Sequence, residues 1–208
     1  MATESRVLVF AKAPQPGTVK TRLMPLLGAE GAAALHQRLI EHTLEQAMAA
    51  DAGPVELWCH PGDTNPFLND CARRYGASLH VQAGADLGAR MLQAFESALR
   101  ISRTAVLIGT DCAVLQATHV RAAANALASG NEAVFCPAED GGYALIGLVR
   151  CCDGIFADIP WGGPFVMADT RERLRQLGLR WIELATVWDI DRPEDYHRMV
   201  AERLLNQR

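Results

Sequence analysis

Short apolar runs alternate with longer segments of helical periodicity along most of this chain. The apolar runs are typical of strands buried inside a parallel sheet. In the segment Ala29–Ala50, Leu35 and Leu39 recur near one face while Glu41 lies on the opposite face, which is the spacing of an amphipathic helix. The pattern predicts strands at Val7–Phe10, Val55–Cys59, Leu79–Gln82, Ala105–Ile108, Ala133–Cys136, Ala144–Val149 and Trp181–Leu184, and helices at Ala29–Ala50, Pro66–Tyr75, Leu87–Ile101, Thr118–Ala128, Val166–Leu177 and Pro193–Leu205.

The regular alternation of strands and helices predicts an α/β fold with a mostly parallel sheet covered on both faces. One connection breaks the rule, because only Pro137–Gly142 separates Ala133–Cys136 from Ala144–Val149, and this segment is too short for a parallel crossover. One of these two strands therefore runs antiparallel or leaves the neighbouring pair. We expect a three-layer α/β/α domain with a mixed sheet, occupying residues 1–208 as a single domain.

The composition narrows the classes of partner. Half of the 208 residues are hydrophobic, 21% are charged, and the net charge is -4, so the chain can build a core and has no electrostatic footprint for nucleic acid. No apolar stretch has membrane-spanning length and no signal-peptide pattern is present, which predicts a cytoplasmic location without a membrane span. The six cysteines form no C-x-x-C pair and no zinc spacing, which favours reduced thiols.

Lysine is confined to one segment of the chain. The only two lysines, Lys12 and Lys20, lie in Phe10–Leu23 beside Arg22, whereas the chain contains eighteen arginines. This cationic segment follows the first predicted strand, and open α/β sheets bind ligands at the carboxyl ends of their strands. We expect a small anionic ligand, with the phosphate oxygens held by compact ammonium groups. The alternative is a surface loop whose charges are merely solvated.

This segment is not a P-loop, although Gly17-Thr-Val-Lys20-Thr resembles one. A P-loop wraps phosphates with backbone N–H groups and needs a glycine where Val19 stands. Pro14 and Pro16 also remove two backbone donors. Side chains must then carry the phosphate recognition, with Gly17 allowing a turn and Lys20 and Arg22 acting as exposed loop charges that contribute little to folding. A P-loop kinase and a dinucleotide-binding site are both disfavoured.

Two acidic positions suggest a divalent metal. Asp111 follows the predicted strand Ala105–Ile108 and so stands at the same edge of the sheet as the lysines. Mg²⁺ or Mn²⁺ bridging this carboxylate and a diphosphate would explain its place, since such ions take one or two carboxylates plus phosphate oxygens. Asp111 could instead cap a helix or close a turn. Asp191 is the better candidate for a second metal contact, while Asp189, on the same face, could equally fix a turn.

A third element is the segment Glu139–Tyr143. Its paired glycines, Gly141 and Gly142, allow the backbone to approach a ligand closely, and Tyr143 offers a ring and a hydroxyl. Asp140 could accept hydrogen bonds from a sugar or acceptor hydroxyl, or act as a base. A simple hairpin turn explains the same residues equally well.

Together these residues resemble the nucleotide-diphospho-sugar transferase superfamily, which has the glycosyltransferase A-type fold. The chain is most similar to a bacterial branch of small transferases with the pattern F-A-K-x-P-x-P-G-x-V-K-T-R-L. That pattern stands at Phe10–Leu23, and the resemblance continues through the whole chain in the same order, at Asp86–Met91, Leu107–Cys112, Glu139–Tyr143 with Leu145–Gly147, Trp161, and Asp189–Asp191 with Pro193–Asp195.

The resemblance implies roles for individual residues. It assigns the nucleotide phosphates to Lys12, Lys20 and Arg22, and it places Leu87, Gly88 and Arg90 near the nucleoside. Phe10, Ala11 and Gly17 are further nucleotide-binding residues. It makes Asp111 a metal ligand that stands where many glycosyltransferases have an aspartate–x–aspartate motif, here reduced to Asp-Cys-Ala, with Asp191 as the second ligand of Mg²⁺ or Mn²⁺. It places five residues on the acceptor side, namely Asp140, Gly141, Gly142, Tyr143 and Trp161. Trp161 could instead be a buried structural residue. The resemblance also makes Lys20, Asp111 and Asp140 the catalytic residues.

The implied function is a metal-dependent transferase that uses an activated nucleotide. Glycosyl transfer from a nucleotide-sugar to an unknown acceptor is preferred. The alternatives are a nucleotidyltransferase of guanylyl or cytidylyl type, which releases pyrophosphate, and a nucleotide-binding module without turnover. The sequence does not identify the base or the sugar of the donor, and it does not identify the acceptor. It is compatible with a homodimer.

Overall fold

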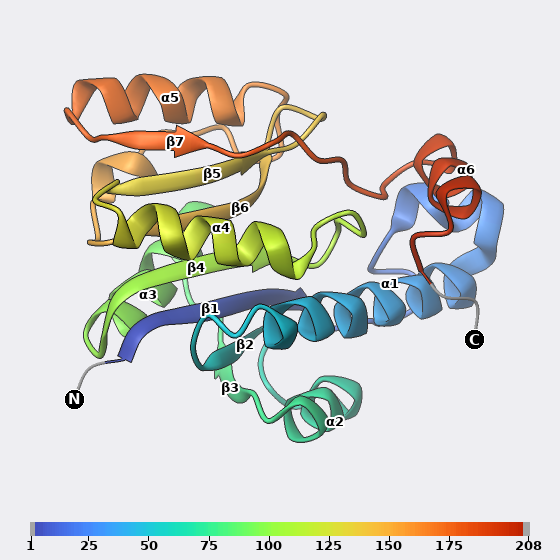
Figure 1. Cartoon of the computed structure of the whole chain (residues 1–208). Helices are drawn as coiled ribbons and strands as arrows, with labels where there is room; N and C mark the ends of the chain where they lie inside the picture. The colour runs from blue at the N-terminus through green and yellow to red at the C-terminus, as the bar shows by residue number, and fades with distance from the viewer. Residues whose placement is uncertain (1–2, 206–208) are drawn as a thin grey trace.

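The computed structural model describes residues 3–205, and within them a seven-stranded sheet forms the middle of three layers (Figure 1). The strands are β1 (Thr3–Lys12), β2 (Val55–His60), β3 (Ser78–Val81), β4 (Ser102–Gly109), β5 (Ala133–Pro137), β6 (Tyr143–Leu148) and β7 (Trp181–Glu183). Their order is β3-β2-β1-β4-β6-β5-β7. Among these described strands only β6 runs against the others, because it pairs antiparallel with both β4 and β5.

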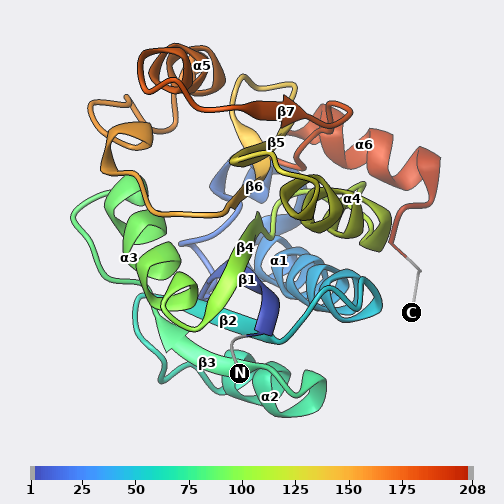
Figure 2. The ribbon, with the colours of Figure 1, turned by 60° about the vertical axis from the view of Figure 1, so that its left-hand side comes forward.

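Helices cover both faces of the sheet (Figure 2). They are α1 (Met24–Ala49), α2 (Pro66–Tyr75), α3 (Leu87–Leu99), α4 (Ala117–Ala128), α5 (Val166–Gln176) and α6 (Pro193–Glu202), with short 3-10 helices at Thr21–Leu23 and Asp153–Ile155. Helices α1, α2 and α4 pack on one face, while α3 and α5 pack on the other. Helix α6 lies beside the amino-terminal part of α1 and shares a smaller apolar cluster with it.

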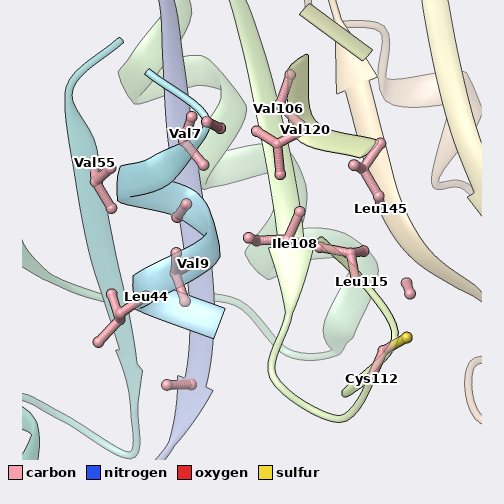
Figure 3. Packing of buried hydrophobic residues seen from close by; sticks show 14 of the residues in the cluster. Val7, Val9, Leu44, Val55, Val106, Ile108, Cys112, Leu115, Val120 and Leu145 are labelled. Carbon is pink, nitrogen blue, oxygen red and sulfur yellow. The ribbon is translucent and has the colours of Figure 1, made fainter. Parts of the chain in front are cut away.

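The alternation of side chains along β1 explains the two cores. Val7 and Val9 point to the face covered by α1 and α4, whereas Leu8 and Phe10 point to the face covered by α3. Figure 3 shows the first core, in which Val7 and Val9 meet Leu44 of α1 beside side chains of β2 and β4. Strands buried on both faces are continuously apolar, which is why these runs were readable in the sequence.

The sequence-based fold class is confirmed, including the mixed sheet. The segment after β5 turns back directly, so β6 enters the sheet between β4 and β5 in the antiparallel direction. Tyr143, the first residue of β6, therefore lies at the edge where β1 and β4 end. This reversal brings the segment 139–143 next to Lys12 and Asp111.

The predicted element bounds differ from the structure mainly at the ends. Strand β1 begins at Thr3 rather than Val7, because its polar first half still pairs with β4, as Thr3 does with Ser102. Helix α1 begins at Met24 rather than Ala29, but Gly28 interrupts it with φ 70°, so the regular helix does begin after that glycine. No helix within residues 3–205 is both long and apolar enough to cross a membrane.

Candidate functional site

Three segments of the chain meet at the carboxyl edge of the sheet. They are the end of β1, the segment after β4 and the segment before α6, and they carry Lys12, Asp111 and Asp189–Asp191. The backbone N–H of Ile190 donates to the carbonyl oxygen of Asp111 at 2.9 Å, which ties the last two segments together. The predicted convergence of the lysines and the acidic residues is therefore present in the structure.

Lys20 connects the cationic loop to both acidic segments. Its Nζ lies 2.5 Å from Oδ1 of Asp111 and 3.0 Å from Oδ1 of Asp191, and its side chain is only 3% exposed. Burial alone would lower the pKa of this ammonium, but the charges of Asp111 and Asp191 outweigh it, so the pKa of Lys20 is raised and the group stays charged. The expectation of an exposed Lys20 is wrong, because two carboxylates draw the ammonium inward. Arg22 is exposed as expected, 3.7 Å from Asp191.

Asp111 remains open to ligand although the protein surrounds it. Desolvation would raise the pKa of its carboxyl, but the charge of Lys20 and the hydrogen bond from its ammonium outweigh this and lower the pKa below its ordinary value. About half of its side-chain surface, 51%, remains accessible. Asp111 is thus an ionised carboxylate with a free side, as a metal ligand must be.

A cavity of about 360 Å³ extends from this carboxylate across the sheet edge, a size at the lower end of the range for small-molecule sites. Residues that the sequence assigned to the site line much of it: Phe10, Ala11, Lys12, Leu87, Arg90, Asp111, Asp140, Gly142, Tyr143 and Trp161. The cavity therefore joins residues expected at the nucleotide with residues expected at the acceptor. Lys12 is exposed, and its Nζ donates to the carbonyl of Thr18 at 2.7 Å.

Six of the expected residues do not line the cavity, namely Gly17, Lys20, Arg22, Gly88, Gly141 and Asp191. Two of them shape its wall instead. A side-chain carbon at Gly88 would lie 2.7 Å from the indole of Trp161, and one at Gly141 would lie 1.9 Å from the carbonyl oxygen of Pro164. Only glycine therefore lets the loop around Trp161 rest against both α3 and the segment 139–143.

His36, on α1, is a cavity-lining residue that the sequence prediction missed. It is 4% exposed, and its Nε2 contacts the carbonyl oxygen of Lys12 at 3.1 Å, so Nε2 must carry the proton and donate it. Burial lowers the pKa of the imidazole, which is therefore neutral. Its Nδ1 is buried without a hydrogen-bond partner, 4.0 Å from Oδ1 of Asp111. An unprotonated nitrogen thus faces the cavity.

Asp189 is a second orphaned group at the same place. It lines the cavity, and its Oδ1 is buried without a hydrogen-bond partner. Burial and the neighbouring charges of Asp111 and Asp140 raise the pKa of its carboxyl to about 7. A buried polar atom without a partner costs stability and is expected to gain one when a ligand binds. The structure thus turns Asp189 toward the cavity and Asp191 toward Lys20.

Comparison with known proteins assigns the chain to a family. The family described as "uncharacterized protein conserved in bacteria (DUF2064)" matches residues 43–163, which is more than half of the chain. The chain belongs to this family. A search of curated proteins finds no match.

Solved structures extend the comparison of this DUF2064 protein. A protein from Desulfovibrio desulfuricans G20, assigned as a nucleotide-diphospho-sugar transferase, is 30% identical, with a TM-score of 0.87 over 99% of this chain and 89% of the other. The resemblance stated from the sequence is confirmed by this likeness. A 4-diphosphocytidyl-2C-methyl-D-erythritol synthase from Anaerococcus prevotii DSM 20548 is 10% identical with a TM-score of 0.66, over 97% and 98% of the two chains, and shares the fold.

A manganese complex is also similar in fold to the DUF2064 chain. It contains Rv0371C from Mycobacterium tuberculosis H37Rv, which is 18% identical with a TM-score of 0.54 over the full length of both chains. In the present structure, the described residues contain no cluster of three or more carboxylate, imidazole or thiolate groups arranged around a metal position. A site completed by ligand oxygens does not need one.

The residues that the sequence prediction missed in this DUF2064 chain had weak signals. His36 stands in the buried stripe of α1 with Leu39 and Ile40, and a lone histidine in such a stripe reads as a core residue. Gln82 follows β3 directly, so it shares with Asp111 the position after a strand. The rule that drew attention to Asp111 could have found Gln82 too.

The raised pKa of Asp189 predicts how stability depends on pH in protein kept free of divalent metal by a chelator. Between about pH 4 and pH 7 the folded state keeps a proton that the unfolded state has lost, so the free energy of unfolding falls as pH rises through this window. Asp189→Asn removes this dependence and should be more stable than wild type at pH 8 by about 2 kcal/mol. Urea unfolding at pH 5 and pH 8 measures the free energy of unfolding of both proteins. If it changed with pH in the same way in both, the raised pKa of Asp189 would be contradicted.

Proposed function

We propose that this protein is a transferase that binds a nucleotide-diphospho-sugar together with a divalent metal and transfers the sugar to an acceptor. The observation that carries the proposal is the single cavity lined by both Lys12 and Asp111 at the carboxyl edge of the sheet. An ammonium group and an ionised carboxylate that line the same cavity suit a diphosphate that is shared between a lysine and a metal ion. The likeness to the Desulfovibrio protein supports the same class of donor.

The residues present fit a divalent cation. Asp111 offers an ionised oxygen, Asp189 offers a buried oxygen without a partner, and His36 offers an unprotonated nitrogen. We propose Asp111 and Asp189 as the protein ligands of Mg²⁺ or Mn²⁺. Asp191, the second ligand expected from the sequence, would instead hold Lys20. When bound, the metal would neutralise charge that develops on the leaving diphosphate.

Asp140 and the glycines beside it would handle the acceptor. Asp140 is exposed, lines the cavity, and accepts a hydrogen bond from the backbone N–H of Gly142 at 2.9 Å through Oδ1. In the proposed reaction the acceptor oxygen forms a bond to the anomeric carbon of the sugar, and the bond from that carbon to the diphosphate oxygen breaks. The acceptor proton moves to Asp140, and the nucleoside diphosphate leaves.

Nucleotidyl transfer is the competing reaction on the same scaffold. There an acceptor phosphate oxygen attacks the α-phosphate of a nucleoside triphosphate, and pyrophosphate leaves. Both reactions need Lys12 and Asp111 at the phosphates, so fold analogy does not separate them. The products distinguish the two reactions, because sugar transfer or donor hydrolysis releases a nucleoside diphosphate, whereas nucleotidyl transfer releases pyrophosphate.

The experiment therefore uses two sets of substrates. Protein with Mn²⁺ is incubated with nucleotide-sugars and, separately, with nucleoside triphosphates and a panel of sugar phosphates, and the products are separated chromatographically. Release of nucleoside diphosphate from a nucleotide-sugar is the expected result. Turnover or thermal stabilisation confined to triphosphates would replace sugar transfer with nucleotidyl transfer. Metal-independent nucleotide binding without any turnover would indicate a binding module.

A further inference from the structure

The part of the cavity that lies over the α3 face of the sheet is apolar. Leu107 of β4 and Ile146 of β6 are register partners on that face, and Phe10 of β1 points to the same side. All three line the cavity, and Met91 of α3 lines it as well. We call this part the apolar chamber and define it by six cavity-lining residues that belong to, or pack against, one apolar cluster: Phe10, Met91, Leu107, Tyr143, Ile146 and Trp161.

Aromatic side chains in contact with one another form one wall of the apolar chamber. The ring of Trp161 lies 6.4 Å from that of Tyr143, nearly perpendicular to it, and 6.4 Å from that of Phe156. Tyr143 in turn meets Phe135 edge to face at 5.2 Å. Rings packed in this way hold their orientation without a ligand, so an apolar group that enters the chamber meets a preformed wall.

The charged side chains are distributed unevenly around the cavity. Of the residues in the segment 140–166 that line it, Asp140 alone carries a charge, and the hydroxyl of Tyr143 and the indole N–H of Trp161 are the other polar side-chain groups. Cationic groups lie toward β2 and β3 instead, where His60 ends β2 and Arg90 donates to the loop after β3. A ligand in the apolar chamber therefore finds one carboxylate and few other polar partners.

These surroundings do not suit a sugar or another polyhydroxylated acceptor. Each hydroxyl of such a molecule loses water on entry and needs a hydrogen-bond partner, and a buried hydroxyl without one weakens binding. A molecule with an apolar body instead removes hydrocarbon surface from water, which strengthens binding. A single hydroxyl beside Asp140 is enough for the proposed transfer.

We propose that the acceptor is a small apolar alcohol that places its hydrocarbon body in the apolar chamber and its single hydroxyl beside Asp140. This inference rests on the proposed function, because it names the acceptor of that transfer. It makes an apolar glycoside the product, and it excludes free sugars and polyols as good acceptors.

Two ring alcohols with the same carbon skeleton test the proposal in the wild-type protein. Cyclohexanol and myo-inositol share a six-membered carbon ring, but the first carries one hydroxyl and the second carries a hydroxyl on every carbon. Saturation-transfer NMR titrations in the presence of Mn²⁺ compare their affinities. We expect cyclohexanol to bind at least about tenfold more tightly. Equal affinities, tighter binding of myo-inositol, or no binding of cyclohexanol would overturn the inference.

Two tryptophans connect the binding to the apolar chamber. Trp161→Ser removes the aromatic wall and should weaken cyclohexanol binding about tenfold. Trp181→Ser is the matched control, since Trp181 packs against the same apolar cluster but does not line the cavity, and it should keep the affinity. Unchanged binding of cyclohexanol to Trp161→Ser would refute the site, whereas the wild-type comparison stands even if that variant fails to fold.

A separate titration distinguishes this inference from the proposed function. Calorimetry with ADP, GDP, CDP and UDP in the presence of Mn²⁺ shows whether the protein binds a nucleoside diphosphate. If one of them binds while the two alcohols have equal affinities, only the apolar acceptor is overturned. If none of them binds, the proposed function fails, and the alcohol loses its role as the acceptor.

Discussion

Asp111→Asn is expected to reduce turnover by about 10²- to 10³-fold while the protein stays folded. The substitution keeps the shape of the side chain and an oxygen that can accept from Lys20, but it removes the negative charge that faces the cavity. Without that charge, a divalent metal would lose its main protein ligand and the leaving diphosphate would lose stabilisation. Product release from a nucleotide-sugar, measured with saturating Mn²⁺ in wild type and variant, gives the ratio.

Asp158→Asn provides the control for this loss. Asp158 has 89% of its side chain exposed, and its nearest cation is Arg173 at 3.7 Å, so the substitution should leave turnover within a factor of about two. The thermal transition of Asp111→Asn should stay cooperative. Nearly full activity in Asp111→Asn would contradict the role given to this carboxylate.

Lys20→Met should produce the largest loss of stability, about 2 kcal/mol, which corresponds to a fall in Tm of roughly 5 °C for a chain of this size. The ammonium is 3% exposed and pairs with both Asp111 and Asp191, so its removal leaves Asp111 without this counter-charge and Asp191 with only the exposed Arg22 at 3.7 Å. A fully buried pair would lose more, but both carboxylates remain about half exposed, and water compensates part of the loss. Denaturant unfolding measures the difference.

Arg22→Met is the matched control for Lys20, because Arg22 belongs to the same loop and faces the same Asp191. Its side chain is 64% exposed and 3.7 Å from that carboxylate, so we expect a change below about 0.5 kcal/mol. Equal losses in the two variants would refute the structural role of Lys20. Asp191→Asn should also lower the free energy of unfolding, but by less than Lys20→Met does. If it instead weakened Mn²⁺ binding without loss of stability, Asp191 would be the metal ligand that the sequence predicted.

The fold was readable from the sequence because local patterns determine it. Apolar runs such as Val7–Phe10 are buried on both faces of the sheet and are therefore recognisable as strands. The connection 137–142 is too short for a parallel crossover, so its length alone predicted the mixed sheet. The ends of elements were less predictable. The polar first half of β1 is held by pairing with β4, a contact between residues far apart in the sequence that no local pattern contains.

The site was predictable as far as strand ends determine it. Lys12 and Asp111 were found because both follow parallel strands, and such ends meet at one edge. The orientation of individual side chains was not predictable. Lys20 turns inward because Asp191, 171 positions away along the chain, meets it there, whereas Asp189, two residues before Asp191, lines the cavity. His36 and Gln82 are fixed by backbone carbonyl groups of other elements.

The affinity of the wild-type protein for a nucleoside diphosphate, titrated calorimetrically with and without Mn²⁺, tests most directly whether Lys12 and a metal at Asp111 share the phosphates. We expect Mn²⁺ to strengthen binding at least about tenfold, because one charge-assisted contact of this kind contributes about 1.5–3 kcal/mol. The same affinity in the presence of Mn²⁺ and of chelator would contradict the account.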